Sequence, residues 1–325
     1  MKIITEEALD LAAECLQHGG LVAFPTETVY GLGANALDPI AVAKIFEAKE
    51  RPTFDPLIVH IASLSQLDDL YARPINPLVY ELARHFWPGP LTIVHQKSDL
   101  VPGLVTSGLD SVAVRMPSHP VALKLLRMAG VPVAAPSANK FGQLSPTSYK
   151  HVEKQAMPID FLVAGDDVAG AVGIESTVVS VDNDVCSILR PGVITAADLQ
   201  KAIPGLIVNV PGKNVKLTSP GLLNSHYSPL KPLYFVTSDQ MELPANSGII
   251  VHSATANVMN ANRVIRTSDN CNLLEVAADL FASLHQMEDD DEVEQIFIEK
   301  IEEKGIGIAI MDRLKKATYQ YKTDC

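Results

Sequence analysis

The sequence lacks several features that define large classes of protein. Its cysteines, Cys15, Cys186, Cys271 and Cys325, are far apart, so there is no CxxC motif for a metal or for redox chemistry. No apolar run approaches the ~20 residues that span a bilayer. The first sixteen residues carry acids in a helical pattern, so no signal peptide is expected. We therefore expect a cytoplasmic protein with reduced thiols and no membrane association.

Common nucleotide-binding and catalytic signatures are also missing. The chain has no GxxxxGK[ST] phosphate loop, no GxGxxG, no GxSxG nucleophile elbow and no HExxH helix. Its net charge of −12 argues against a general nucleic-acid coat, which would be basic, although a local basic pocket remains compatible with it. If the chain binds a nucleotide, it does so with another architecture.

The length and the composition indicate two α/β domains. A chain of 325 residues exceeds the ~250–300 at which single cores stop growing. Strand and helix patterns interleave over residues 1–205, stop in the Pro- and Gly-rich segment 206–231, and restart over 232–325. We expect a larger domain, a linker and a small second domain. Pro-rich loops near 88–90 and 102–108 interrupt a simple βαβ alternation, so a mixed sheet is expected.

Apolar periodicity and capping residues set the expected elements. Asp38 followed by Pro39 is typical of a helix N-cap and first helical residue. Helices are expected from residue 5 to 18, from residue 38, and near 77–86, 119–129, 273–285, 292–303 and 309–317. Strands are expected at 21–24, 57–61, 91–94, 112–115, 131–135, 177–181, 233–236 and 248–251, and a loop at 25–33.

Two early segments place polar side chains where a core has no need of them. The loop PTETVYGLG (residues 25–33) follows a strand, where open α/β sheets bind ligands, but a simple turn also fits. Lys49 and Arg51 end the second helix. They either complement the helix dipole or clamp a phosphate, with lysine as a point charge and arginine as a fork. His60 lies inside the next apolar strand, where it is either structural or functional.

Two later segments have similar alternatives. Arg115 ends the strand SVAVR, where it would either capture a carboxylate or phosphate or form an ordinary ion pair. In PSAN (residues 136–139), small residues at a strand end would let a ligand approach the backbone. Ser137 and Asn139 would then present hydrogen-bonding groups, or the segment is a turn closed by local hydrogen bonds.

Taken in order, these segments resemble the threonylcarbamoyl-AMP synthase family, the YrdC-like enzymes, in its long two-domain form. The resemblance extends to GIEST (173–177), LRPG (189–192), the linker SPGLLNSHYSP (219–229) and GIGIAIMDRLKKA (305–317). It covers nearly the whole chain. Lys49, Arg51, Ser137 and Asn139 look like the signature tetrad of that family.

The resemblance implies a fold and an activity. The fold would be a twisted open mixed α/β sheet around a concave pocket, with a smaller Rossmann-like C-terminal domain. L-Threonine, bicarbonate or CO2, and ATP with Mg²⁺ would give threonylcarbamoyl-adenylate and pyrophosphate. Downstream transferase proteins would then move the threonylcarbamoyl group to tRNA.

The resemblance also implies roles for individual residues. Both substrates are anions, so Lys49 and Arg51 would face the triphosphate as catalytic groups that suppress charge repulsion. Threonine would be held by Thr28, His60, Arg115, Ala135 (through its backbone) and Thr177. ATP would be bordered by Lys49, Arg51, Asp55, Ser111, Ser137, Asn139, Ser145, Arg190 and Tyr227.

The sequence departs from the family at two places. Asp55 stands where the family has asparagine, and the linker residues 222–225 (LLNS) replace a more basic stretch. Tyr227 remains and would act as a lid, or else as a spacer residue packed on either domain. Two rival functions are an RNA-binding module, which the acidic charge disfavours, and carbamoyl transfer from carbamoyl phosphate. Enzymes of the second kind carry an acylphosphatase unit and zinc-finger cysteines that this chain lacks.

Overall fold

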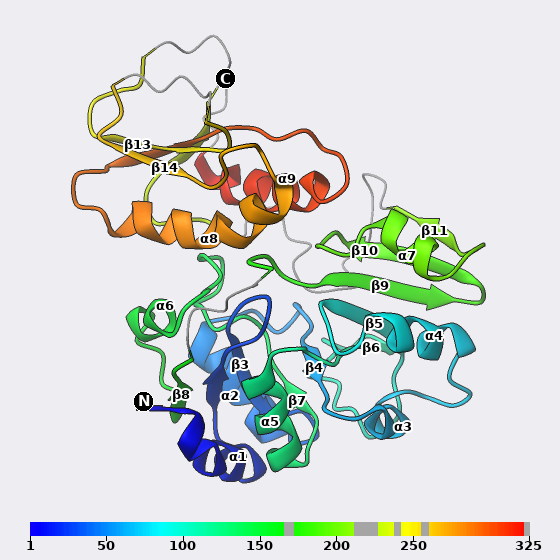
Figure 1. The fold of residues 1–325 in the computed structure, drawn as a ribbon. Helices are drawn as coiled ribbons and strands as arrows, with labels where there is room; N and C mark the ends of the chain where they lie inside the picture. Colours follow the sequence, from blue (N-terminus) through cyan, green and yellow to red (C-terminus); the bar gives the residue numbers. More distant parts are fainter. Residues whose placement is uncertain (166–171, 211–226, 237–241, 255–259, 322–325) are drawn as a thin grey trace.

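The protein forms two sheets, each with its own helices (Figure 1). The structure, a computed structural model, describes residues 1–165, 172–210, 227–236, 242–254 and 260–321. The first sheet has strand order β1-β8-β2-β3-β7-β4-β6-β5-β9-β10-β11 and mixes parallel and antiparallel pairs. The second has order β12-β15-β13-β14, and all its pairs are parallel. The expected mixed sheet and Rossmann-like second domain are confirmed.

The first domain holds eleven strands and seven α-helices among the described residues. The strands are β1 (Lys2–Ile4), β2 (Val22–Phe24), β3 (Gly31–Asn35), β4 (Ile58–His60), β5 (Leu91–Gln96), β6 (Ser111–Arg115), β7 (Val133–Ala134), β8 (Phe161–Val163), β9 (Thr177–Asp182), β10 (Val185–Arg190) and β11 (Ile207–Asn209). The helices are α1 (Leu9–Gln17), α2 (Pro39–Lys49), α3 (Leu67–Leu70), α4 (Pro77–Phe86), α5 (Pro120–Ala129), α6 (Tyr149–Lys154) and α7 (Ala196–Ala202).

Helices cover both faces of the sheet around β2 and β3. Val22 and Phe24 of β2 pack in the same apolar cluster as α1 and α5. Ala23, which points to the opposite face, packs in the larger cluster that contains α2 and α4. Burial on both faces explains why the sequence of β2 is a continuous apolar run rather than an alternating one.

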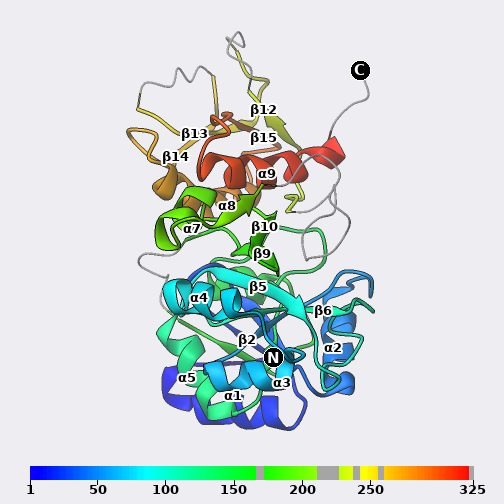
Figure 2. The ribbon, with the colours of Figure 1, turned by 90° about the vertical axis from the view of Figure 1, so that its right-hand side faces the viewer.

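The second domain is a four-stranded sheet with two helices. Its elements are β12 (Leu233–Phe235), β13 (Ser247–Val251), β14 (Arg263–Arg266), α8 (Leu273–Asp289), β15 (Gln295–Ile298) and α9 (Gly307–Ala317). Both helices lie on the side of this sheet that faces the first domain (Figures 1 and 2). One apolar cluster joins Phe281 and other residues of α8 to Val29, Leu144 and Ile174 of the first domain, so the two domains share an apolar contact.

Several sequence expectations are wrong at the level of elements. The helix expected at 292–303 is strand β15, which lies between β12 and β13 and is buried at Ile296, Phe297 and Ile298. A short apolar run does not distinguish a buried strand from a helix by periodicity, and its branched and aromatic residues favour the strand. The loop expected at 25–33 ends in β3. The first α-helix begins only at Leu9, after a 3₁₀ turn, and the Thr5 side chain makes no cap.

The linker and five strands also differ from expectation. Strands β1, β8, β10, β11 and β14 were not expected; β1, β8 and β11 have three residues each, whereas β10 is as long as β9 and was missed. The segment expected to be linker, residues 206–231, begins with β11, which pairs with β10 and therefore belongs to the first sheet. Most of the remaining linker, residues 211–226, lies outside the described residues.

Gly173 brings the GIEST segment against the second domain. Its φ is +69°, and a Cβ there would lie 2.2 Å from the Ala278 carbonyl oxygen and 2.3 Å from that of Ala277, both on α8. We expect Gly173→Ala to destabilise the protein by roughly 2 kcal/mol or more, because strain at positive φ adds to a backbone clash. Thermal unfolding measures the effect. Gly103→Ala, at a glycine with open space around it, is the matched control. Equal stability of the two variants would contradict the close approach.

Candidate active site

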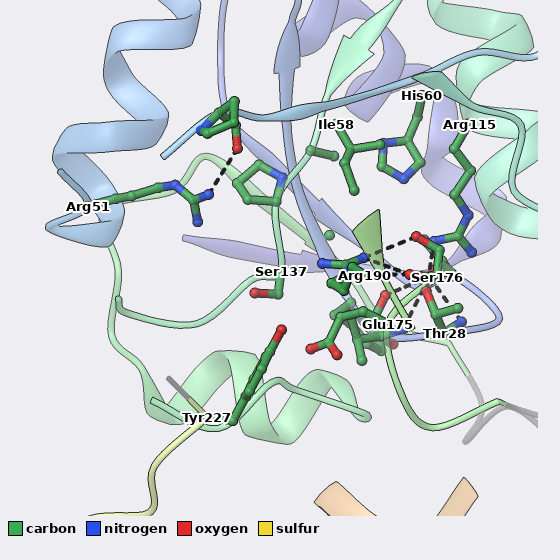
Figure 3. Close-up of a pocket in the computed structure, with 17 residues that line it drawn as sticks. Thr28, Arg51, Ile58, His60, Arg115, Ser137, Glu175, Ser176, Arg190 and Tyr227 are labelled. Carbon is green, nitrogen blue, oxygen red and sulfur yellow. Dashed lines mark hydrogen bonds between the residues drawn. The ribbon is translucent and has the colours of Figure 1, made fainter. Parts of the chain in front are cut away.

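A cavity of about 60 Å³ lies on one face of the first sheet, against side chains of strands β4 and β6 (Figure 3). Ile58 and His60 are two residues apart on β4 and therefore face the same side, as do Ala113 and Arg115 on β6. The cavity is lined by Thr26, Thr28, Val29, Tyr30, Gly31, Arg51, Pro56, Ile58, His60, Arg115, Ala135, Pro136, Ser137, Glu175, Ser176, Arg190 and Tyr227.

Eight of the residues expected to bind substrates line this cavity. They are Thr28, Arg51, His60, Arg115, Ala135, Ser137, Arg190 and Tyr227. They come from seven separate stretches of chain, and Figure 3 shows those that it labels around one space. The structure therefore brings together residues that the sequence could only associate by family resemblance.

The other expected residues do not line the cavity. Three of them, Asn139, Ser145 and Thr177, have side chains that form hydrogen bonds inside the cavity walls. Asn139 Nδ2 donates to the carbonyls of Lys140 and Gln143, and Thr177 Oγ1 donates to the Ile194 carbonyl. Ser111 begins β6, four residues from Arg115, which is about 13 Å along a strand. The structure does not bring Ser111 to the cavity.

Lys49 supports the wall rather than facing the space. Helix α2 ends at Lys49, and the φ of 53° at the next residue, Glu50, turns the chain and sends Lys49 and Arg51 in different directions. The Lys49 Nζ donates to the Ser137 carbonyl at 2.5 Å and also to the Asn139 carbonyl. Burial lowers the pKa of Lys49 well below its usual value, and the nearby Arg51 acts in the same direction. In this structure Lys49 fixes the PSAN turn and does not point into the cavity.

Arg51 lines the cavity and is paired with Asp55. Its Nη2 lies 2.8 Å from the Asp55 carboxylate and donates to the Pro56 carbonyl at 3.0 Å, and both charged side chains are buried. The acid that departs from the family pattern is therefore the counter-ion of this arginine. Asp55 and the Pro56 carbonyl hold the guanidinium in one orientation at the cavity wall, where Figure 3 shows Arg51.

Arg115 is fixed by three groups. Its Nη1 donates to Thr28 Oγ1 at 2.9 Å, its Nε donates to the Gly89 carbonyl at 3.3 Å, and its Nη2 lies 2.5 Å from the Glu27 carboxylate. Burial alone would raise the pKa of Glu27, but Arg115 outweighs it and the pKa falls below its usual value. Glu27 was not among the site residues expected from the sequence, although it lies inside the PTET motif. A guanidinium oriented in this way suits a carboxylate.

His60 presents a neutral ring to the cavity. Burial, assisted by the charge of Arg115, lowers its pKa to about 3. Its Nδ1 is buried and has no hydrogen-bond partner among the described residues. A buried ring nitrogen without a partner is costly unless a ligand or water satisfies it. His60 can therefore bind a polar group of a substrate without adding charge.

Arg190 and Tyr227 complete the cavity. Arg190 donates to the Ser176 carbonyl from Nε at 3.2 Å and from Nη2 at 2.9 Å. Tyr227 is fully buried, lines the cavity and also packs on Phe281 of the second domain, with 5.6 Å between ring centroids. Tyr227 therefore contacts the cavity and the second domain at the same time.

The cavity chemistry suits an anionic ligand. Three of its lining residues are arginines, against one acid, Glu175. Among the described residues no group of three or more His, Cys, Asp and Glu side chains could hold a metal ion, so no residue of the described chain is assigned as a metal ligand. Within the same residues, no helix is long and apolar enough to cross a membrane.

The fold and the cavity define a two-domain YrdC-like α/β protein with an arginine-lined ligand site. The family model described as "Telomere recombination" (Sua5, YciO and YrdC) matches residues 14–192. The model for the "Threonylcarbamoyl-AMP synthase, C-terminal domain" matches residues 194–318. The chain belongs to the threonylcarbamoyl-AMP synthase family.

Curated relatives and a solved structure match nearly the full length. The threonylcarbamoyl-AMP synthase of Pyrococcus abyssi is 42% identical, over 97% of this chain and 95% of its own. That of Bacillus subtilis is 41% identical, over 94% of this chain and 91% of its own. The crystal structure of P. abyssi Sua5 complexed with L-threonine superposes with a TM-score of 0.88 at 40% identity and covers 98% of each chain.

Proposed function

We propose that this protein is an L-threonylcarbamoyladenylate synthase that joins L-threonine, bicarbonate or CO2, and ATP. The observation that carries the proposal is the cavity itself. Eight residues expected from the family resemblance surround one space in a chain that matches curated threonylcarbamoyl-AMP synthases along nearly its full length. The threonine bound in the P. abyssi structure supports the choice of amino acid.

The residues of the cavity fit the two anions of this reaction. The threonine amine adds to CO2 and releases a proton, or condenses with bicarbonate and releases water, to give a carbamate. A carbamate oxygen then attacks the α-phosphorus of ATP, and the bond to the β-phosphate breaks to release pyrophosphate. Arg115 would pair with the threonine carboxylate, while Arg51 and Arg190 would offset the phosphate charge. No covalent intermediate with the protein is needed.

Mg²⁺ would enter with ATP. Because it prefers phosphate oxygens and water to all-protein cages, the described residues need not supply a cluster of ligands. Its contribution would be to neutralise charge on the phosphates.

The product requires an acceptor. A carbamate-adenylate is a reactive mixed anhydride, so we propose that downstream transferase proteins carry its threonylcarbamoyl group to tRNA in the cytoplasm. Tyr227 lines the cavity and packs on Phe281 of the second domain, and we propose that it acts as a lid over the nucleotide.

The amino-acid specificity tests the proposal. If Thr28 and His60 surround an amino acid, its hydroxyl should find a partner, and a site built around a hydroxyl rejects an analogue that lacks it. We expect threonine, and serine weakly, to stimulate pyrophosphate release from ATP in the presence of bicarbonate, and valine to give none above background. Equal stimulation of pyrophosphate release by valine would contradict the assignment of threonine as the substrate. Omitting the amino acid or the bicarbonate is the control for simple ATP hydrolysis.

A further inference from the structure

Arg313, on helix α9 of the second domain, reaches into the wall of the cavity in the first. It is 1% exposed. Its Nε lies 2.9 Å from the Glu175 carboxylate in the GIEST segment, and its Nη1 donates to the Pro191 carbonyl in LRPG at 2.7 Å. One guanidinium therefore ties together the two segments that carry Ser176 and Arg190 to the cavity.

Glu175 is the acid among the cavity-lining residues, and it is 7% exposed. Ser145 Oγ donates to its Oε1 at 2.5 Å, and Arg313 holds its Oε2. Burial alone would raise the pKa of Glu175, but the charges of Arg313 and Arg190 outweigh it, so the carboxylate is ionised. In Figure 3 this side chain lies beside Tyr227 and Arg190. An ionised acid in this place would repel a triphosphate unless its charge were offset.

We propose that Arg313 is a positioning residue for the reaction: the second domain supplies it to neutralise Glu175 and to hold the Glu175 and Arg190 segments in a geometry that accepts ATP. The proposal rests on the proposed function for the identity of the nucleotide. It gives the second domain a role in the active site beyond carrying the linker. The guanidinium carbon of Arg313 also lies 5.7 Å from the centre of the Tyr227 ring, so the same side chain supports a third part of the wall.

A purely structural role explains these contacts less well. The apolar cluster around Phe281 already docks the two domains. A buried ion pair adds little to stability, because desolvation offsets much of its attraction. Removing only its cation, however, leaves a buried charge without its main partner. The pair is thus expected to matter most for what the cavity can bind.

The test compares Arg313→Met, Glu175→Gln and the double variant. ATP affinity is measured by calorimetry with MgATP, and KM and kcat are measured by pyrophosphate release. We expect Arg313→Met to weaken ATP binding by roughly tenfold or more, as typical for stranding a buried charge. The double variant should bind ATP more tightly than Arg313→Met, because the stranded acid is gone, but less tightly than Glu175→Gln alone, because the contacts of Arg313 with the Pro191 carbonyl and with Asp312 are still missing. Wild-type ATP affinity in Arg313→Met, or a double variant at least as weak as Arg313→Met, would overturn the proposal.

Two further variants guard against misfolding and against general loosening of the domains. Arg313→Lys keeps the charge but loses the fork, and it should bind ATP more tightly than Arg313→Met. Lys154→Ala removes a solvent-exposed ion pair with Asp289 across the same domain boundary and should leave ATP affinity unchanged. If Arg313→Met does not fold, Arg313→Lys replaces it in the test. The positioning role of Arg313 is then contradicted if Arg313→Lys binds ATP as tightly as the wild type and if adding Glu175→Gln does not change its ATP affinity. ATP binding tests the role of Arg313 even if neither the wild type nor any variant releases pyrophosphate. Absence of pyrophosphate release from all of these proteins would count against the proposed function instead.

Discussion

Replacing Arg51 by alanine is expected to lower the rate of pyrophosphate release by roughly 10²–10³-fold, the usual loss when one preorganised charge is removed from such a site. Arg51 lines the cavity and is held by Asp55 and by the Pro56 carbonyl, so its guanidinium needs no reorganisation when phosphate arrives. Single-turnover rates at saturating ATP measure the effect on the chemical step.

The control for Arg51 must remove its buried partner as well. Arg51→Ala leaves the Asp55 carboxylate without this cation, and breaking a buried pair in that way typically costs ~3–5 kcal/mol of stability. Arg51→Ala combined with Asp55→Asn should recover much of that stability but not the activity. If the double variant regained near-wild-type turnover, Arg51 would be a structural residue and not part of the phosphate site.

Arg115→Ala is expected to raise the KM for threonine by roughly 10²-fold, because a paired carboxylate–guanidinium contact is worth a few kcal/mol and each 1.4 kcal/mol is a factor of ten. Arg115 is oriented by Thr28, Gly89 and Glu27 before any ligand arrives. Steady-state kinetics with threonine and ATP varied separately measure the effect.

The specificity of that effect distinguishes a threonine site from a collapsed cavity. Arg115→Lys keeps a charge beside Glu27 but cannot form the fork, so it should lie between the wild type and Arg115→Ala. The KM for ATP should change little in either variant. A parallel rise in both KM values would mean that Arg115 mainly supports the cavity wall and does not choose the amino acid.

Strand-end and loop residues were the part of the site that the sequence predicted well. Arg115 ends a strand, Ser137 follows one, and Thr28 lies in a loop after one, and the structure places all three around the cavity. Their positions follow from local sequence, because the end of a short buried strand fixes where the next side chain points. The same reasoning placed strands β2, β4, β5, β6, β7 and β9 of the first sheet, but not β3, which was expected to be loop.

Contacts between segments that are far apart in the chain could not be predicted from the sequence. Lys49 and Arg51 look equivalent along the chain, but the turn at Glu50 sends one to backbone carbonyls and the other to the cavity. The partners of Glu27 and Glu175 are 88 and 138 residues away, at Arg115 and Arg313. At these separations, the residues around each acid do not indicate which arginine it pairs with. Strand β15 was mispredicted for a related reason, since its burial between two other strands is a tertiary fact.

Synthesis of threonylcarbamoyl-AMP by this protein is tested most directly by the fate of labelled carbon. The protein is incubated with MgATP, L-threonine and ¹³C-bicarbonate, and the nucleotide products are identified by mass spectrometry immediately after mixing. We expect a labelled threonylcarbamoyl-AMP, formed together with pyrophosphate and absent when threonine is omitted. Pyrophosphate release that needs neither threonine nor bicarbonate, with AMP as the only nucleotide product, would contradict it.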